Sequence, residues 1–90
     1  MKSNGDICEE IISEVSRAEA KHPNLPSDPN LPSDIVFLAY VLAYVISDQA
    51  ADLRDKCEDY HYGYRPTTKD EIRKEAIQTA ATCIRLLKNL

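Results

Sequence analysis

The sequence is poor in residues that mark several large classes of protein and site. Lys and Arg number 11 against 15 Asp and Glu, and the resulting net charge of −4 argues against a nucleic-acid backbone as the main partner. The cysteines are odd in number and widely spaced, at Cys8, Cys57 and Cys83, which favours reduced thiols over a disulfide framework or a zinc site. With only two glycines the chain has no glycine-rich phosphate loop, and it shows no Ser-His-Asp arrangement.

Apolar runs of membrane-spanning length are also missing. The longest run, Ile35 to Ile46, has 12 residues, whereas a membrane span needs about 20. Glu9, Glu10 and Glu14 occupy the region where a signal peptide would need an apolar core. We therefore expect a soluble, cytoplasmic protein that does not cross a membrane.

What the chain does contain is helical periodicity, first between Asp6 and Lys21. Apolar residues recur there at helical spacing, namely Ile7, Ile11, Ile12, Val15 and Ala18. Asp6 is a natural N-cap, and Glu9 three residues later completes a capping-box-like pair. The helix is expected to end at His22, because the residue before Pro23 is pushed out of the α region.

A proline-rich loop, residues 22–33, follows the first helix. It contains a short tandem repeat, Asn-Leu-Pro-Ser-Asp-Pro followed by Asn-Leu-Pro-Ser-Asp, with four prolines between positions 23 and 32. Such a segment is extended and stiff. We interpret it as a spacer, with Leu25 and Leu31 as the residues that would dock on a partner if it is a recognition loop.

The second helix is expected to start at Ser33 or Asp34 and to reach about Tyr60. Its first half is apolar on every side, from Ile35 to Ile46. A three-helix monomer of this size can cover only one face of such a helix, so the remainder predicts a homo-oligomer formed through the second helix.

The last helix begins at Thr68, which caps it with Glu71 at the capping-box position. An aromatic loop, residues 60–67, separates it from the second helix. The apolar stripe of the last helix is formed by Ala76, Ile77, Ala80, Ala81, Ile84 and Leu87. The whole chain thus predicts a single all-α domain over residues 1–90, with a short N-terminal helix and two long antiparallel helices that complete a helical bundle by oligomerisation.

Acidic side chains lie on both long helices where an antiparallel arrangement would bring them near each other. Glu71 and Glu75 are one turn apart at the start of the last helix, and Asp48 and Asp52 are one turn apart on the second. Carboxylates are the protein ligands that Mg²⁺ prefers. The alternative is a solvated helix start for the glutamates and a cation from Lys56 for the aspartates.

The aromatic loop offers a second candidate site. Tyr60, Tyr62 and Tyr64, with Arg65, could stack on a base and hold a phosphate. The alternative is that these tyrosines cap the edge of the core. Glu58 and His61 have the Glu-x-x-His spacing of di-iron bundles, but only one copy is present and it lies at a helix end.

Two segments carry a resemblance to a known family. Lys74 to Ala81 reads Lys-Glu-Ala-Ile-Gln-Thr-Ala-Ala, and Ser13 to His22 reads Ser-Glu-Val-Ser-Arg-Ala-Glu-Ala-Lys-His. In order and composition the chain resembles the small MazG-like nucleoside triphosphate pyrophosphohydrolases common in phages and prophages. The resemblance implies an all-α protein that cuts nucleoside triphosphates to monophosphate and pyrophosphate with Mg²⁺. It assigns the metal ligands to Asp48, Asp52, Glu71 and Glu75, and the catalytic role to Glu71 and Glu75.

The acidic motif departs from the family pattern at two positions. Gln49 stands where the resemblance expects a metal-binding glutamate, and Gln78 stands at the companion acidic position after Glu75. A different register places Tyr40, Val41 and Tyr44 in the first motif and leaves no ligand there. We therefore expect impaired catalysis in a cleft of nucleotide size, with ligand contacts from Tyr60, Tyr62, Tyr64, Arg65, Arg17 and Lys21.

Three functions remain open from the sequence. The first is a magnesium-dependent pyrophosphohydrolase with an impaired site. The second is a protein on the same scaffold that sequesters a nucleotide or nucleotide-derived signal without cutting it. The third is a regulatory homo-oligomer in which the second helix serves only assembly.

Overall fold

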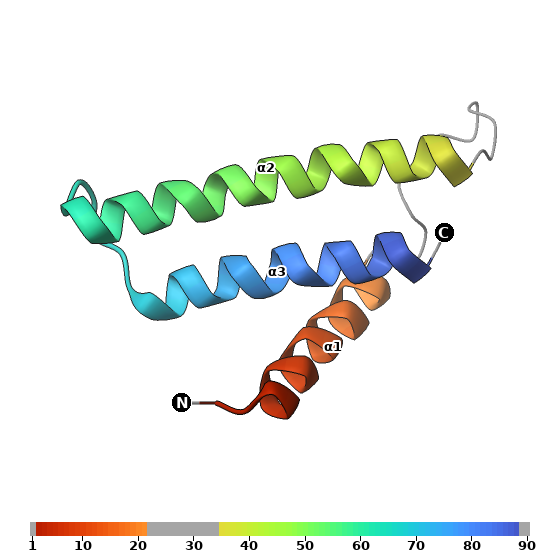
Figure 1. Ribbon diagram of the computed structural model, residues 1–90, viewed down its shortest axis with the longest axis horizontal. Helices are drawn as coiled ribbons and strands as arrows, with labels where there is room; N and C mark the ends of the chain where they lie inside the picture. Colours follow the sequence, from red (N-terminus) through yellow and green to blue (C-terminus); the bar gives the residue numbers. More distant parts are fainter. Residues whose placement is uncertain (1, 22–34, 89–90) are drawn as a thin grey trace.

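The computed structural model describes residues 2–21 and 35–88, which form three α-helices (Figure 1). These are α1 (Asn4–Lys21), α2 (Ile35–Tyr62) and α3 (Lys69–Lys88). The described residues contain no strand, so the predicted all-α class is confirmed. The proline-rich loop lies outside the described residues.

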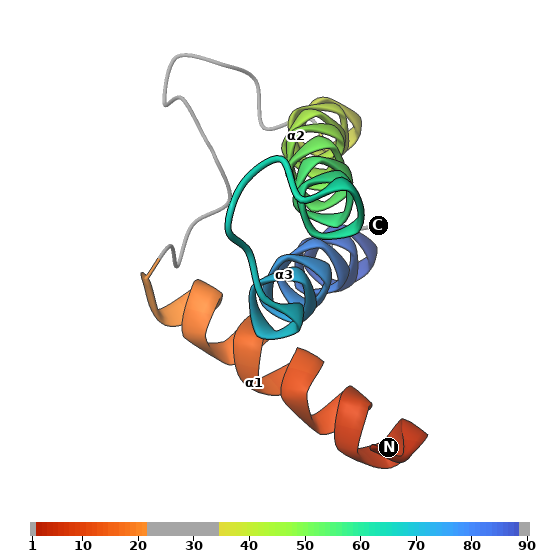
Figure 2. The same ribbon diagram turned by 90° about the vertical axis from the view of Figure 1, so that its left-hand side faces the viewer.

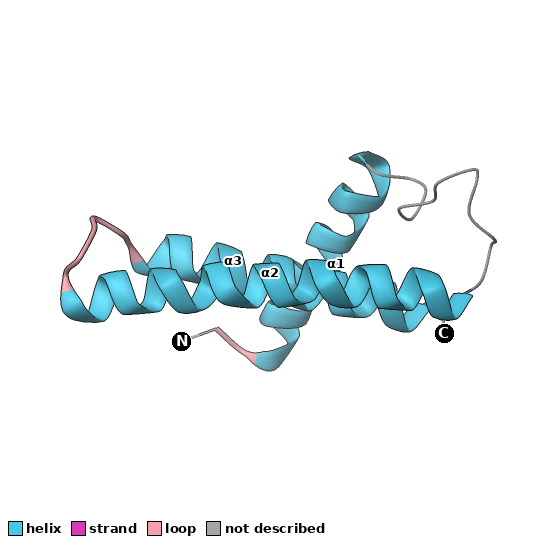
Figure 3. Ribbon diagram, turned by 90° about the horizontal axis from the view of Figure 1, so that it is seen from above, coloured by secondary structure: helices cyan, strands magenta, loops and turns pink. Residues whose placement is uncertain are grey.

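The helices are arranged around α3. Helices α2 and α3 run antiparallel as a long hairpin, and α1 crosses α3 obliquely on another side (Figures 1 and 2). Seen from above, α1 lies across the hairpin rather than along it (Figure 3). In the described part of the chain, α1 and α2 each contact α3 but their backbones do not approach each other. The predicted antiparallel pairing of the two long helices is confirmed.

The core is small and takes one side chain from each helix. Val15, Leu42 and Ala81 are the hydrophobic residues that are buried among those described, with 5%, 3% and 2% of their surface exposed. Ala81 carries only a methyl group, which lets α3 lie close to its neighbours. Most other apolar side chains of the described residues keep part of their surface in solvent.

Hydrogen bonds at the start of α3 match the expected capping box. The Thr68 amide donates to Glu71 Oε2 at 3.1 Å, and the Glu71 amide donates to Thr68 Oγ1 at 3.1 Å. These two bonds satisfy backbone donors that have no partner within the helix. The predicted cap at Thr68 is confirmed.

The start of α1 differs from the expectation. The helix begins at Asn4, and the Asp6 amide donates to Ser3 Oγ at 3.1 Å while the Ser3 amide donates to Asp6 Oδ2 at 3.4 Å. The prediction of Asp6 as N-cap with Glu9 is wrong, because Ser3 lies three residues earlier and uses Asp6 as its own capping-box partner.

Helix α2 ends two residues beyond the expected Tyr60. Gly63 has a φ of +74° and its amide donates to the Asp59 carbonyl at 2.8 Å, which is the left-handed glycine end typical of helices. Tyr60 and Tyr62 therefore belong to the last turn of α2 rather than to a loop. No helix of the described residues combines the length and the apolar character that crossing a bilayer requires.

Candidate functional site

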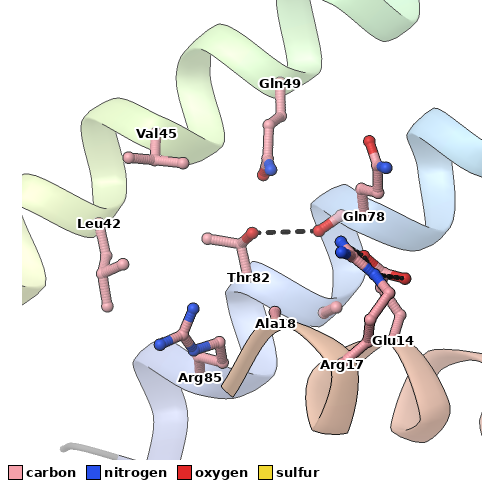
Figure 4. A pocket seen from close by; sticks show the side chains of 10 residues that line it. Glu14, Arg17, Ala18, Leu42, Val45, Gln49, Gln78, Thr82 and Arg85 are labelled. Atoms are coloured by element: carbon pink, nitrogen blue, oxygen red, sulfur yellow. Dashed lines mark hydrogen bonds and ion pairs between the residues drawn. The ribbon is translucent and has the colours of Figure 1, made fainter. Parts of the chain in front are cut away.

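A cavity of about 520 Å³ lies where the three helices converge, and we call it the three-helix pocket (Figure 4). Its volume falls within the range of sites that bind small molecules, about 300–1,000 Å³. The lining residues are Glu14, Arg17, Ala18, Leu42, Val45, Gln49, Gln78, Ala81, Thr82 and Arg85. The pocket therefore depends on the packing of all three helices.

Helix α1 contributes an ion pair to the wall. Arg17 Nε donates to the two carboxylate oxygens of Glu14 at 2.9 and 3.1 Å, and a terminal nitrogen of Arg17 also donates to Oε1. These hydrogen bonds lower the pKa of Glu14 below its usual value. Both side chains are therefore charged at neutral pH, and the guanidinium is held in a defined orientation.

Helix α3 contributes Gln78, Thr82 and Arg85, which are four and three residues apart and so share one face. Thr82 Oγ1 donates to the backbone carbonyl of Gln78 at 3.1 Å, a bond drawn in Figure 4. That bond keeps the hydroxyl close to the helix backbone. Arg85 places a second guanidinium on the pocket wall.

Helix α2 contributes Leu42, Val45 and Gln49, which also share one helical face. Figure 4 shows the Gln49 side chain pointing from α2 toward α3. Its Oε1 atom is buried and has no hydrogen-bond partner within the described residues. The lining thus combines an apolar side near Leu42 with a polar side near Gln49.

The pocket wall carries both charged and neutral polar groups. Its charged side chains are two arginines, Arg17 and Arg85, and one glutamate, Glu14. The two amides and the Thr82 hydroxyl add neutral groups that can both donate and accept hydrogen bonds.

The four carboxylates predicted as metal ligands are distributed along the hairpin. Asp48 and Asp52 are exposed on α2, Glu71 belongs to the cap of α3, and Glu75 is half-buried. Gln49 is level with Gln78 because both line one pocket, and Glu71 lies seven residues before Gln78, about 10 Å along the helix axis.

Within the described residues, no three Asp, Glu, His or Cys side chains gather closely enough to hold a metal ion. The ligand set of Asp48, Asp52, Glu71 and Glu75 stays a prediction from the resemblance.

Glu71 is engaged by the helix start. Thr67 Oγ1 donates to Glu71 Oε2 at 2.7 Å, and the Thr68 amide donates to the same oxygen. The hydrogen bond from Thr67, followed by that from Thr68, lowers the pKa of Glu71 below its usual value. The carboxylate is thus held in its charged form by local partners.

The tyrosines predicted as ligand contacts lie at the end of α2 and just after it. Tyr62 lies about 20 Å along the helix axis from Gln49, the nearest residue of α2 that lines the three-helix pocket. The rings of Tyr62 and Tyr64 stack with centroids 5.3 Å apart and planes 22° apart, and His61 meets Tyr62 edge-on. Tyr60, Tyr62 and Tyr64 are all exposed, so within this chain they do not cap the core.

The structure therefore separates the predicted ligand contacts into two groups. Arg65 lies with the tyrosines, while Arg17 lines the three-helix pocket and Lys21 is exposed at the end of α1. No sequence pattern points to Thr82, Arg85 or the apolar side of the pocket as functional. Gln49 and Gln78 stand out in the sequence only as departures from the acidic motif, and that departure is the one signal that points to the pocket.

The two registers of the acidic motif have different positions in the structure. In one register the unexpected residue is Gln49, which faces α3 and the pocket. In the other, Tyr40 and Tyr44 are exposed, with hydroxyl oxygens 3.1 Å apart and rings edge to face. Only the first register places a motif position opposite Gln78.

Comparison with known protein families, with curated proteins and with solved structures finds no match to this chain. The resemblance to MazG-like proteins therefore depends on the two quoted segments alone.

Proposed function

We propose that this chain is a MazG-like nucleotide-binding protein that holds a nucleoside phosphate in the three-helix pocket. The observation that carries the proposal is the pocket itself, which combines two guanidinium groups with neutral hydrogen-bonding groups and an apolar side. A nucleotide has parts that match each of these groups. Its phosphate chain is anionic, and its flat base has an apolar face and a polar edge.

The glutamines favour binding over hydrolysis. Gln49 and Gln78 occupy positions where the resemblance expects carboxylates, and both line the pocket. A neutral amide coordinates Mg²⁺ less well than a carboxylate and cannot act as a general base. A pocket with amides at these positions suits a protein that sequesters a nucleotide without cutting it.

The test is nucleotide binding by calorimetry, using ATP, GTP, CTP and UTP with wild type and Arg85→Met. Loss of the guanidinium should weaken binding roughly 10–100-fold, the range for a hydrogen bond to a charged group. The matched control is Arg54→Met, because Arg54 is an exposed arginine on α2 that pairs only with its neighbour Asp55 within the described residues. The proposal fails if wild type binds no nucleotide, or if both variants weaken binding equally.

The same samples decide between sequestering and hydrolysis. After incubation with Mg²⁺ and Mn²⁺, the free nucleotides, monophosphates and nucleotides released by denaturation are quantified by chromatography. Intact nucleotide in the bound fraction supports the proposal. Monophosphate and pyrophosphate that disappear in Glu75→Gln would instead establish the pyrophosphohydrolase implied by the resemblance.

We also propose that the chain forms a homo-oligomer through α2. Tyr40 and Tyr44, one turn apart on that helix, are 57% and 59% exposed. Single apolar residues on a surface are ordinary, but a contiguous group on one helix is typical of an interface. Light scattering at micromolar concentration tests this, and a monomer there would contradict it.

A further inference from the structure

The three-helix pocket contains a buried hydrogen-bond acceptor that has no partner, the side-chain oxygen of Gln49. Among the side chains of the described residues, it is the one buried nitrogen or oxygen atom without a hydrogen bond. Figure 4 shows Gln49 pointing from α2 into the space in front of Gln78 and Thr82.

Two side chains of the pocket lining donate hydrogen bonds within the protein. The Thr82 hydroxyl donates its single proton to the Gln78 carbonyl, and Arg17 donates to Glu14 through Nε and one terminal nitrogen. A hydroxyl has only one proton to give, so Thr82 cannot serve Gln49 at the same time. None of these bonds reaches the Gln49 oxygen, which is left as an acceptor for the donor of a ligand.

A buried acceptor without a partner destabilises the folded chain, because it has lost its hydrogen bond to water without replacing it. A ligand that donates a proton to Gln49 removes this penalty at the moment of binding. A ligand without a donor at that position leaves the penalty in place and binds more weakly.

We propose that Gln49 is the specificity-determining residue of the pocket and that it selects an adenine nucleotide. This rests on the proposed nucleotide-binding function. A carboxamide pairs with adenine through two bonds, the amide oxygen accepting from the 6-amino group and the amide nitrogen donating to N7. The guanidinium groups of Arg17 and Arg85 come from the other two helices and meet the phosphates.

The first experiment needs only the wild-type protein and two ligands. ATP is compared by calorimetry with purine riboside triphosphate, which has the same phosphates and ring but lacks the 6-amino group. We expect ATP to bind roughly 5–100-fold more tightly, the discrimination that one good bidentate pair supplies. Equal binding of the two would overturn the inference and leave the proposed function intact, whereas binding of neither would overturn the proposed function.

The second experiment uses Gln49→Met, which keeps the length of the side chain and removes both polar groups. The variant should lose the preference for ATP over purine riboside triphosphate while retaining weak binding through the phosphates. Without ligand it should unfold at a higher temperature than wild type, because the unpartnered oxygen is gone. These two changes have opposite signs, which a purely structural role for Gln49 would not produce.

The matched control is Gln78→Met, because Gln78 lines the same pocket from α3 and its side chain has no buried, unpartnered atom. It should not raise the unfolding temperature. Stabilisation by Gln78→Met equal to that by Gln49→Met would contradict the special role of Gln49. So would a Gln49→Met protein that still prefers ATP.

Discussion

The start of α3 and the three-helix pocket hold their polar groups in opposite ways. At the start of α3, Thr67, Thr68 and Glu71 lie within five consecutive residues and satisfy one another by short, local hydrogen bonds. In the pocket, the polar side chains come from three helices, and the oxygen of Gln49 has no partner within the described residues. One region is complete without a ligand, and the other has an acceptor left for one.

This difference teaches where a function should be sought in the molecule. The sequence points first to four carboxylates as a candidate site. In the structure Glu71 accepts hydrogen bonds in the cap of α3, and the other three lie along the hairpin. The pocket has few carboxylates and mixed chemistry, yet it is the place where distant segments meet. A group of residues far apart in sequence that leaves a polar atom unpartnered is a better indicator of binding than a local charge cluster.

The largest loss of stability is expected from a change at Leu42, which lines the pocket and also belongs to the buried core. Leu42→Ala removes a side chain that is 3% exposed and should reduce the free energy of unfolding by about 2–5 kcal/mol. Urea denaturation measures it. Leu87→Ala is the control, because Leu87 is 68% exposed on α3 and its loss should change stability by less than about 0.5 kcal/mol. A similar cost for both would contradict the burial that distinguishes them.

A smaller effect is expected at the start of α3. Thr68→Ala removes the hydroxyl that accepts from the Glu71 amide and should cost about 1 kcal/mol in the free energy of unfolding. Thr68→Ser keeps the hydroxyl and should retain most of the stability. Hydrogen exchange of the first α3 amides should speed up in the alanine variant only, and uniform exchange in both variants would rule out a local cap.

The acid dependence of stability should also report on this cap. The hydrogen bonds from Thr67 and Thr68 lower the folded-state pKa of Glu71 below its ordinary value of 4.5. The bonds therefore add stability at pH above about 4.5, and that contribution is lost as the pH falls through the lowered folded-state pKa. Glu71→Gln should show a shallower loss of stability below pH 4.5 in urea titrations, and Thr67→Val should do the same. If both variants lose stability below pH 4.5 as steeply as wild type does, this account is contradicted.

The smallest effect is expected at the end of the hairpin. Tyr62→Ala removes an exposed ring that stacks on Tyr64, and it should change nucleotide binding by less than about twofold if the three-helix pocket is the site. Calorimetry with ATP measures this beside Arg85→Met. A strong loss in Tyr62→Ala with no loss in Arg85→Met would move the site to the tyrosines.

The sequence predicted the parts of the fold that depend on local rules. The all-α class, the antiparallel pair of long helices and the Thr68 cap follow from apolar spacing, a short connection and a hydroxyl three residues before a glutamate. The same local rule failed at α1, because both Ser3 and Asp6 can cap a helix and the choice between them depends on their geometry. Helix α2 ends at Tyr62, two residues later than expected, because Gly63 adopts the left-handed conformation that stops a helix.

The sequence by itself determined three helices, the cap at the start of the last one and which residues carry charge, because these depend on neighbours within a few positions. The predicted start of the second helix at Ser33 or Asp34 lies outside the described residues. The sequence also marked Gln49 and Gln78 as departures from an acidic motif. Only the tertiary structure decided that these glutamines share a pocket with Arg17 and Arg85 while the predicted carboxylates lie elsewhere. The physical reason is register: sliding α3 along α2 by one turn leaves every local hydrogen bond intact but changes every pair of residues that meet across the hairpin.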